Sequence, residues 1–171
     1  MKKYGDDLLW GTLGEGCLVL AVCLISWRAH QPLIFASLGP TVYELVEQPQ
    51  LRSARIYNIV VGHMIGLGAG FFGIYIFHAW SEPNVLATGI VAWDRVWAIT
   101  LAAALTTFGT LALKASQPAA LATTLLVSLG AMQTRRDAVA IVVGVLVTAL
   151  IGEPVRRFRL KRTKLRSVLA E

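Results

Sequence analysis

Long apolar segments limit what this chain can fold into. Residues 8–27, 56–79, 91–113 and 138–155 are each almost continuously apolar. As helices, such segments are long enough to cross the roughly 30 Å hydrocarbon core of a membrane. Charged residues make up only 15% of the chain and largely avoid these segments, whereas a soluble domain carries about 25%. The sequence therefore predicts an all-α polytopic membrane protein.

Two shorter apolar segments, residues 31–46 and 117–132, lie between the long ones. One opens with R-A-H-Q-P at 28–32 and the other with K-A-S-Q-P, 86 positions later. This layout predicts two related halves, about residues 8–79 and 91–155, each a long span, a short Pro-started segment and a long span. Paired short or Pro/Gly-interrupted segments in matching places indicate a transporter's binding site.

Two topologies are compatible with this layout. If both short segments cross, six helices form an inverted 3+3 repeat; if both are re-entrant, four spans form parallel halves. Segments of about 15 residues are short for a crossing, which favours four spans. Loop charge favours six spans, because that topology leaves few basic residues opposite the termini. Those few are Arg28, Arg95, Arg135 and Arg136. We predict six helices, with Arg95 paired to Asp94 at the membrane surface.

A basic tail follows the last apolar segment. Residues 156–166 contain seven Lys and Arg and supply most of the net charge of +6. A basic cluster directly after a span favours a cytoplasmic anchor on anionic lipid over nucleic-acid binding. We expect one membrane domain over residues 1–155 and a cytoplasmic tail over 156–171. Both termini are expected in the cytoplasm of a bacterial inner membrane, and so thin a bundle favours a homo-oligomer.

The short segments supply the first candidate site. Pro32 and Pro118 are predicted at the first position of short helices, where the missing N–H costs nothing. A helix N-terminus carries free N–H groups and partial positive charge, which suit an anion. Two such starts facing each other near the midplane would bind a small inorganic anion. The neighbouring polar residues are Gln31, Ser37 and Thr41 in the first copy, and Gln117, Thr123 and Thr124 in the second. Alternatively, these hydroxyls are structural and bond back to their own helices.

Three ionisable or polar residues lie within long apolar segments. His63 is a candidate hydrogen-bond donor or proton carrier, because an ionisable group at membrane depth is usually functional. Bridging to a neighbouring helix is its structural alternative. Asn58 is expected to face the same cavity, and Glu15 is a candidate proton-coupling carboxylate.

Glycines at positions 62, 66 and 70 form two overlapping G-x-x-x-G steps. Helices approach closely where side chains are this small. We expect this face to pack against the symmetry-related helix or a second subunit.

Three ordered motifs resemble the HPP family of small integral membrane proteins. They are L-I-F-A-S-L-G-P-T at 33–41, N-I-V-V-G-H at 58–63 and S-Q-P-A-A-L-A-T-T at 116–124. The resemblance covers roughly residues 8–155. Its motif residues carry over to Ser37, Asn58, His63, Pro118 and Thr123.

The resemblance implies a function, but this chain departs from the family pattern at two places in the predicted site. Plant and cyanobacterial members of the family are associated with nitrite transport, and members are often described with four spans. In this chain S-Q-P at 116–118 replaces the family's H-P-P, and Pro40 stands where a small residue is usual. Both changes fall at the predicted site, so they leave the substrate and the coupling open.

Catalysis finds no support in the sequence. None of the phosphate-binding, zinc-protease or nucleophile-elbow motifs occurs, so no catalytic residue, metal ligand or cofactor is predicted. We expect transport of a small inorganic anion, nitrite first. The alternative is a non-transporting sensor or partner-binding subunit that acts through the basic tail.

Overall fold

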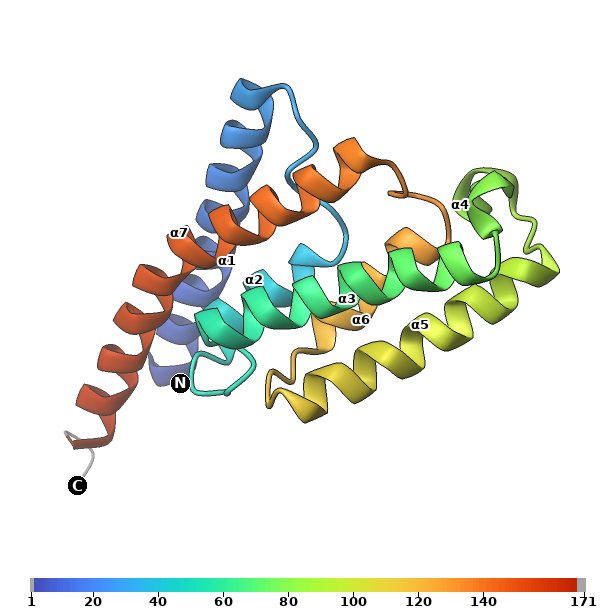
Figure 1. The fold of residues 1–171 in the computed structure, drawn as a ribbon. Helices are drawn as coiled ribbons and strands as arrows, with labels where there is room; N and C mark the ends of the chain where they lie inside the picture. The colour runs from blue at the N-terminus through green and yellow to red at the C-terminus, as the bar shows by residue number, and fades with distance from the viewer. Residues whose placement is uncertain (1, 169–171) are drawn as a thin grey trace.

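The computed structural model describes residues 2–168 of the chain, with side chains over residues 8–162. Within residues 2–168 every regular element is a helix, as the sequence predicts. The long helices are α1 (Lys2–Ala29), α3 (Ile56–Ile76), α5 (Trp93–Ala112) and α7 (Arg135–Val168) (Figure 1). Two short helices, α2 (Leu38–Glu47) and α6 (Pro118–Ser128), lie between them. A 3-10 turn, η1 (Ala79–Ser81), and a one-turn helix, α4 (Val85–Thr88), connect α3 to α5.

Four helices are long and apolar enough to cross a membrane. Their apolar parts are Leu8–Ala29, Ile56–Ile76, Trp93–Ala112 and Arg135–Arg162. The four predicted long spans are therefore confirmed. Helices α2 and α6 have only 10 and 11 residues, which at 1.5 Å per residue makes each roughly 15 Å long. Neither short helix alone matches the thickness of the hydrocarbon core.

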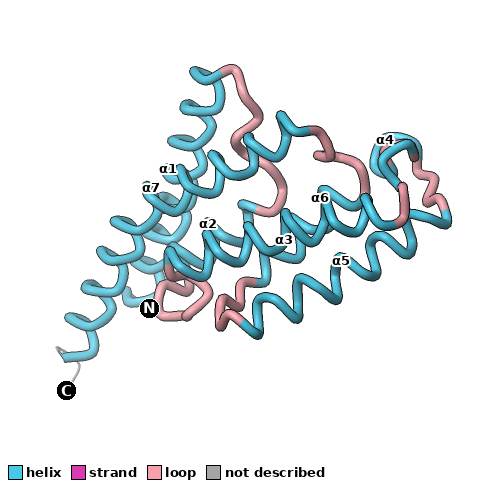
Figure 2. The backbone as a smooth tube through the Cα atoms, in the orientation of Figure 1, coloured by secondary structure: helices cyan, strands magenta, loops and turns pink. Residues whose placement is uncertain are grey.

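The two short helices begin differently. Helix α6 starts at Pro118 with Gln117 as its N-cap, as predicted. Helix α2 starts at Leu38, so the prediction that Pro32 opens a helix is wrong. Gly39 and Pro40 lie in its first turn and do not interrupt it. Before Leu38 the chain has no regular structure over residues 32–35 and turns at 36–37 (Figure 2).

A local hydrogen-bond pattern explains the late start of α2. Helix α1 ends where His30 adopts a left-handed φ of 50°. The Ser26 hydroxyl then donates to Gln31 O at 2.5 Å and accepts from Leu33 N–H at 3.1 Å. These bonds hold the chain in a turn around Pro32, so the helix can form only farther on.

Residues 31–47 follow α7 along its apolar part. At the start of α7, Arg136 Nε donates to Gln31 Oε1 at 3.1 Å. Near the other end, Arg156 Nη1 donates to Pro49 O at 3.1 Å. The segment spans this length because its first part is non-helical, and a non-helical chain rises more per residue than a helix.

The second short segment follows α3 in the same way. At the start of α3, the Tyr57 hydroxyl donates to Leu113 O at 2.9 Å. Beyond its end, Gln133 Nε2 donates to Trp80 O at 3.3 Å. Helix α6 and its flanking turns therefore extend along the whole of α3.

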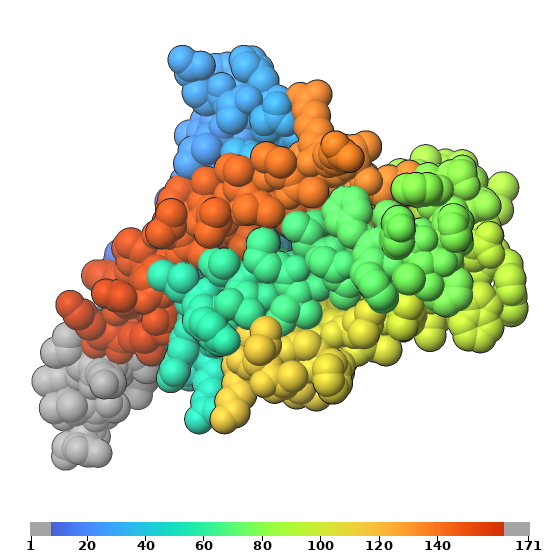
Figure 3. Space-filling view, viewed as in Figure 1, coloured from blue at the N-terminus to red at the C-terminus, as the bar shows by residue number. Residues whose placement is uncertain are grey.

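Helix α3 is central to the bundle and packs against α5, α6 and α7, whereas α1 packs mainly on α2 and α7 within the described residues. The C-terminal part of α1 projects beyond its neighbours (Figures 1 and 3). It leaves Leu20, Leu24 and Trp27 exposed. These side chains suit contact with lipid or with another subunit.

The glycine face of α3 packs against α6. A Cβ on Gly66 would lie 2.3 Å from Ala120 O, and one on Gly70 would lie 2.8 Å from Val127 Cβ. Close packing is thus confirmed, but the expected partner is wrong. Because α6 lies along α3, the glycines meet this short helix and not the symmetry-related helix or a second subunit.

A Gly66→Ala variant is expected to lose stability, since its new methyl group collides with the α6 backbone. Overpacking of this kind costs about 1–3 kcal/mol. Gly68→Ala is the matched control, because a Cβ on Gly68 meets no atom within 4 Å. Thermal unfolding of the purified protein in detergent should show a lower Tm for Gly66→Ala only. Equal Tm values for the two variants would contradict the packing described.

Candidate functional site

Four fully buried polar side chains meet where α2, α3 and α6 converge. They are Ser37, which caps α2, and Thr41, His63 and Thr123. Thr41 Oγ1 lies 3.0 Å from His63 Nε2, and His63 Nδ1 lies 2.6 Å from Thr123 Oγ1. Thr123 Oγ1 also lies 2.8 Å from Ser37 Oγ. This polar quartet ties both short helices to α3.

The quartet can satisfy either neutral tautomer of the imidazole. A neutral His donates from one ring nitrogen and accepts at the other. Each threonine hydroxyl also has a backbone acceptor at 3.4 Å, Ser37 O for Thr41 and Ala119 O for Thr123. The threonine beside the N–H nitrogen donates to its backbone acceptor, while the other threonine donates to the ring. The arrangement can therefore carry a proton on either side of His63.

Thr124 does not join the quartet. Its hydroxyl lies 2.7 Å from that of Thr106 and links α6 to α5. It also donates to Ala120 O at 3.0 Å. The structural alternative for this residue, back-bonding to its own helix, therefore holds.

The remaining predicted residues lie at the ends of the short segments. Asn58 Nδ2 donates to Ser116 O at 3.1 Å, and Gln117 Nε2 donates to Ser53 O at 3.3 Å. Pro118 follows directly, so the α6 start lies beside the start of α3. Gln31 and Pro32 lie beside the start of α7.

The two helix starts therefore do not face each other, and that part of the predicted site is wrong. The start of α2 instead meets the second turn of α6, through Ser37 and Thr123. The cause is the delayed start of α2 at Leu38, which leaves Pro32 well outside the helix.

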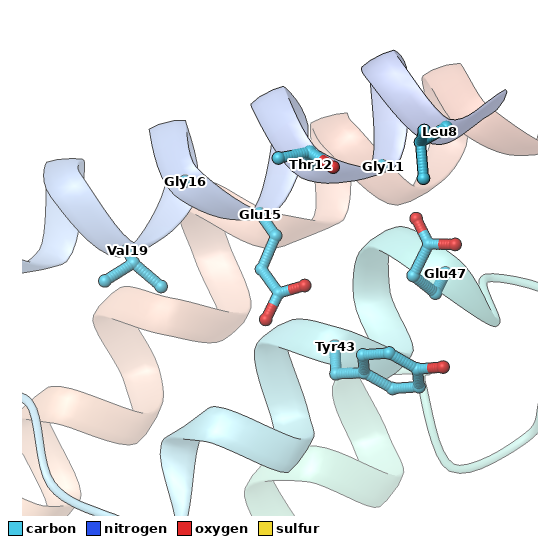
Figure 4. Close-up of a pocket in the computed structure, with 8 residues that line it drawn as sticks. All are labelled: Leu8, Gly11, Thr12, Glu15, Gly16, Val19, Tyr43 and Glu47. Carbon is cyan, nitrogen blue, oxygen red and sulfur yellow. The ribbon is translucent and has the colours of Figure 1, made fainter. Parts of the chain in front are cut away.

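Glu15 faces a groove between α1 and α2. The groove has a volume of about 740 Å³, and both Glu15 and Glu47 line it (Figure 4). The Glu15 side chain extends from α1 toward α2 (Figure 4). A Cβ on Gly11 would lie 2.1 Å from Glu47 Oε1, so this glycine makes room for the second carboxylate.

Arg95 is buried, which contradicts its predicted position in a surface ion pair with Asp94. Its guanidinium donates to Glu82 O at 2.6 Å, Ser128 O at 2.9 Å and Pro83 O at 3.1 Å. It thereby joins the α3–α5 connection to the end of α6. Backbone carbonyl partners leave no trace in a sequence, so sequence reasoning could not find this role.

Three further residues with buried polar atoms were absent from the predicted site. Within residues 8–162, Glu44 Oε2, Glu47 Oε1 and Thr148 Oγ1 are buried without a hydrogen-bond partner, although Glu47 Oε1 lies 3.5 Å from Arg159 Nη2. Glu44 could have been found, since it is a carboxylate within a short apolar segment. Thr148 gives no such signal, because threonine is common in membrane helices. No group of three or more His, Cys, Asp or Glu side chains within the described residues could hold a metal ion.

A known protein family matches nearly the whole chain. The family profile described as "HPP, transmembrane region" matches residues 2–157. The chain belongs to the HPP family. It is accordingly an integral membrane protein. No curated protein and no solved structure matches it.

In this HPP protein the altered motif lies apart from the quartet. Ser116 and Gln117 stand at the first two positions of the H-P-P motif, and both anchor the start of α6. The S-Q-P stretch therefore stands at the start of α6, apart from His63 and from the hydroxyls of Ser37, Thr41 and Thr123. Pro40 has an exposed side chain in the first turn of α2.

A double-mutant cycle can test the quartet as a unit. Ser37→Ala and Thr123→Val each remove one hydroxyl of the 2.8 Å pair, so their effects on unfolding free energy should not add. Contacting residues in one network typically couple by about 0.5–3 kcal/mol. Ser37→Ala combined with Thr110→Val is the control, since the Thr110 hydroxyl donates to carbonyls of its own helix α5. Additivity in both pairs would show that the quartet is not cooperative.

Proposed function

We propose that this HPP protein transports a small inorganic anion, with nitrite as the first candidate. The supporting observation is a helix that begins inside the bundle, where its N-cap Ser37 joins the polar quartet. A half-helix that starts at membrane depth directs partial positive charge toward a ligand, as in transporters with broken helices. Nitrite is suggested by the resemblance to plant and cyanobacterial HPP proteins.

The proposed topology has six crossings in an inverted 3+3 repeat, with both termini in the cytoplasm of a bacterial inner membrane. Residues 31–47 run beside α7 and residues 113–133 beside α3, which supports a crossing by each short segment. Ser37 and Thr123 are 86 positions apart, the offset of the sequence repeat, and bond to each other. Equivalent residues can touch only near an axis that relates the halves.

Proton coupling fits the groove between α1 and α2. Glu47 Oε1 lies 3.5 Å from Arg159 Nη2, so that guanidinium balances its charge. An ionised Glu15 would repel an anion in the same groove, because like charges repel strongly where water is scarce. Protonation removes that repulsion, so the same groove would accept an anion together with a proton. Glu15 remains the coupling candidate, and the quartet offers a further proton relay.

The proposal also includes contact with a second subunit and contact with lipid. The exposed part of α1 favours a homo-oligomer, and the basic tail favours contact with anionic lipid. The non-transporting alternative, a sensor or partner-binding subunit, uses that tail as its output.

Labelling of single cysteines distinguishes the two topologies. In the six-crossing topology Ser53→Cys faces the same side as the tail and Thr88→Cys faces the opposite side. The four-span topology reverses both assignments. Cys17 and Cys23 would first be replaced by serine, and a membrane-impermeant maleimide would then be applied to vesicles of known orientation. Labelling of Ser53→Cys from the side opposite the tail would exclude six crossings.

Nitrite uptake into proteoliposomes under an imposed pH gradient tests the function. We expect saturable uptake by the wild type, and at least tenfold slower uptake by His63→Ala and by Ser37→Val/Thr123→Val. Such a loss corresponds to roughly 1.4 kcal/mol or more. Thr110→Val should transport normally, since its hydroxyl bonds within α5.

Each component of the proposal can fail separately. Unchanged uptake by His63→Ala would remove that residue from the mechanism. Uptake by Glu15→Gln that still responds to the gradient would remove Glu15 as the coupling group. Absence of uptake of any small anion by the wild type would favour the partner-binding alternative.

A further inference from the structure

A second cavity lies at the start of α2. It has a volume of about 370 Å³ and shares Val19 with the groove of Figure 4. We call it the α2-start cavity. Its walls come from α1, the chain before α2, α2 itself and α7: Val19, Val22, Ile34, Phe35, Ala36, Leu38, Gly39, Val42 and Thr148.

One wall of the α2-start cavity carries an unused hydroxyl. Thr148 is fully buried, and its Oγ1 has no hydrogen-bond partner among the described residues. Other buried hydroxyls of the bundle do bond, for example Thr110 to its own helix and Thr106 to Thr124. A buried hydroxyl without a partner is unfavourable. The Thr148 hydroxyl therefore indicates a ligand that accepts a hydrogen bond from it.

The stretch before α2, which also lines the cavity, carries unused peptide donors. Among the described residues, the N–H groups of Ile34, Phe35, Ala36 and Ser37 have no hydrogen-bond acceptor. Farther on, Leu38 N–H donates to Phe35 O at 2.9 Å. The excess donors therefore belong to the stretch just before α2, most of which lines the cavity. Hydrocarbon offers such groups no acceptor.

The lining also limits the charge of an acceptor. None of the lining residues is charged, and most are apolar. Neutral donors beside a helix N-terminus can stabilise one negative charge, but burying a second charge without a basic partner would be far more costly. The cavity therefore suits a monovalent anion better than a divalent one.

We propose that the α2-start cavity is the binding site for a small monovalent inorganic anion, held by the Thr148 hydroxyl and the peptide N–H groups before α2. This inference rests on the proposed function and assigns its binding site. The Ser37 side chain bonds to Thr123 and does not line the cavity. The quartet is then a positioning element that fixes the start of α2, while the anion binds beside Thr148.

Calorimetric titration of the purified protein in detergent with sodium nitrite tests the site, with sodium gluconate as the ionic-strength control. Thr148→Val keeps the side-chain shape and removes the donor. Its affinity for nitrite should fall about tenfold or more, as expected for one hydrogen bond to a charged ligand. Thr148→Ser retains the hydroxyl and Thr110→Val alters a buried threonine outside the cavity, so both should bind like the wild type.

A second variant fills the cavity. A Cβ on Gly39 meets no atom within 4 Å, and Gly39 lines the cavity. Gly39→Leu should therefore fold with a Tm close to that of the wild type and lose nitrite binding. Wild-type affinity in both Thr148→Val and Gly39→Leu would overturn the assigned site.

Uptake by the same preparations separates the site from the proposed function. Normal binding by the wild type without uptake would overturn transport and leave the site intact. Saturable wild-type uptake that is unchanged in Thr148→Val and Gly39→Leu would overturn the site and leave transport intact. Absence of nitrite binding to the wild type would overturn the site whatever the uptake shows.

Discussion

A peptide group that leaves a helix at membrane depth needs another partner, because lipid supplies none. This constraint applies to residues 32–37, where the chain descends beside α7 before α2 begins. At one end, the Ser26 hydroxyl supplies partners by donating to Gln31 O and accepting from Leu33 N–H. The Ser37 side chain bonds to Thr123 at the other end. Between them lie the N–H groups of residues 34–37, which have no acceptor among the described residues. Residues 34–36 line the α2-start cavity.

Close packing makes the polar quartet possible. The glycine face of α3 brings α6 near enough for His63 to reach Thr123, while α2 approaches from the other side with Thr41. Three elements are thereby joined through one imidazole. Bulk on the glycine face would separate α3 from α6 and remove the contact that orients the ring. Packing and polar chemistry in this bundle therefore depend on each other.

Hydrophobic segments and hydroxyl positions allowed much of this architecture to be predicted. The four long helices, the start of α6 at Pro118 and the choice of Ser37, Thr41, His63 and Thr123 as candidates follow from pattern alone. The structure brings those four side chains together. The start of α2 could not be predicted, because the Ser26 side chain, 12 residues before Leu38, decides it through bonds to the backbone. Arg95 and Thr148 were missed for a related reason: their significance lies in carbonyls or empty space contributed by distant parts of the chain.

The contact between Ser37 and Thr123 has a consequence for how such a fold could arise. If the halves descend from one gene, the ancestral protein was a dimer in which this position touched its own copy. A side chain on such an axis must pair with itself. A hydroxyl can do so, since it both donates and accepts, whereas a lysine or an aspartate would repel its twin. Serine and threonine at these positions therefore fit an origin in self-recognition, before the two copies were joined in one chain.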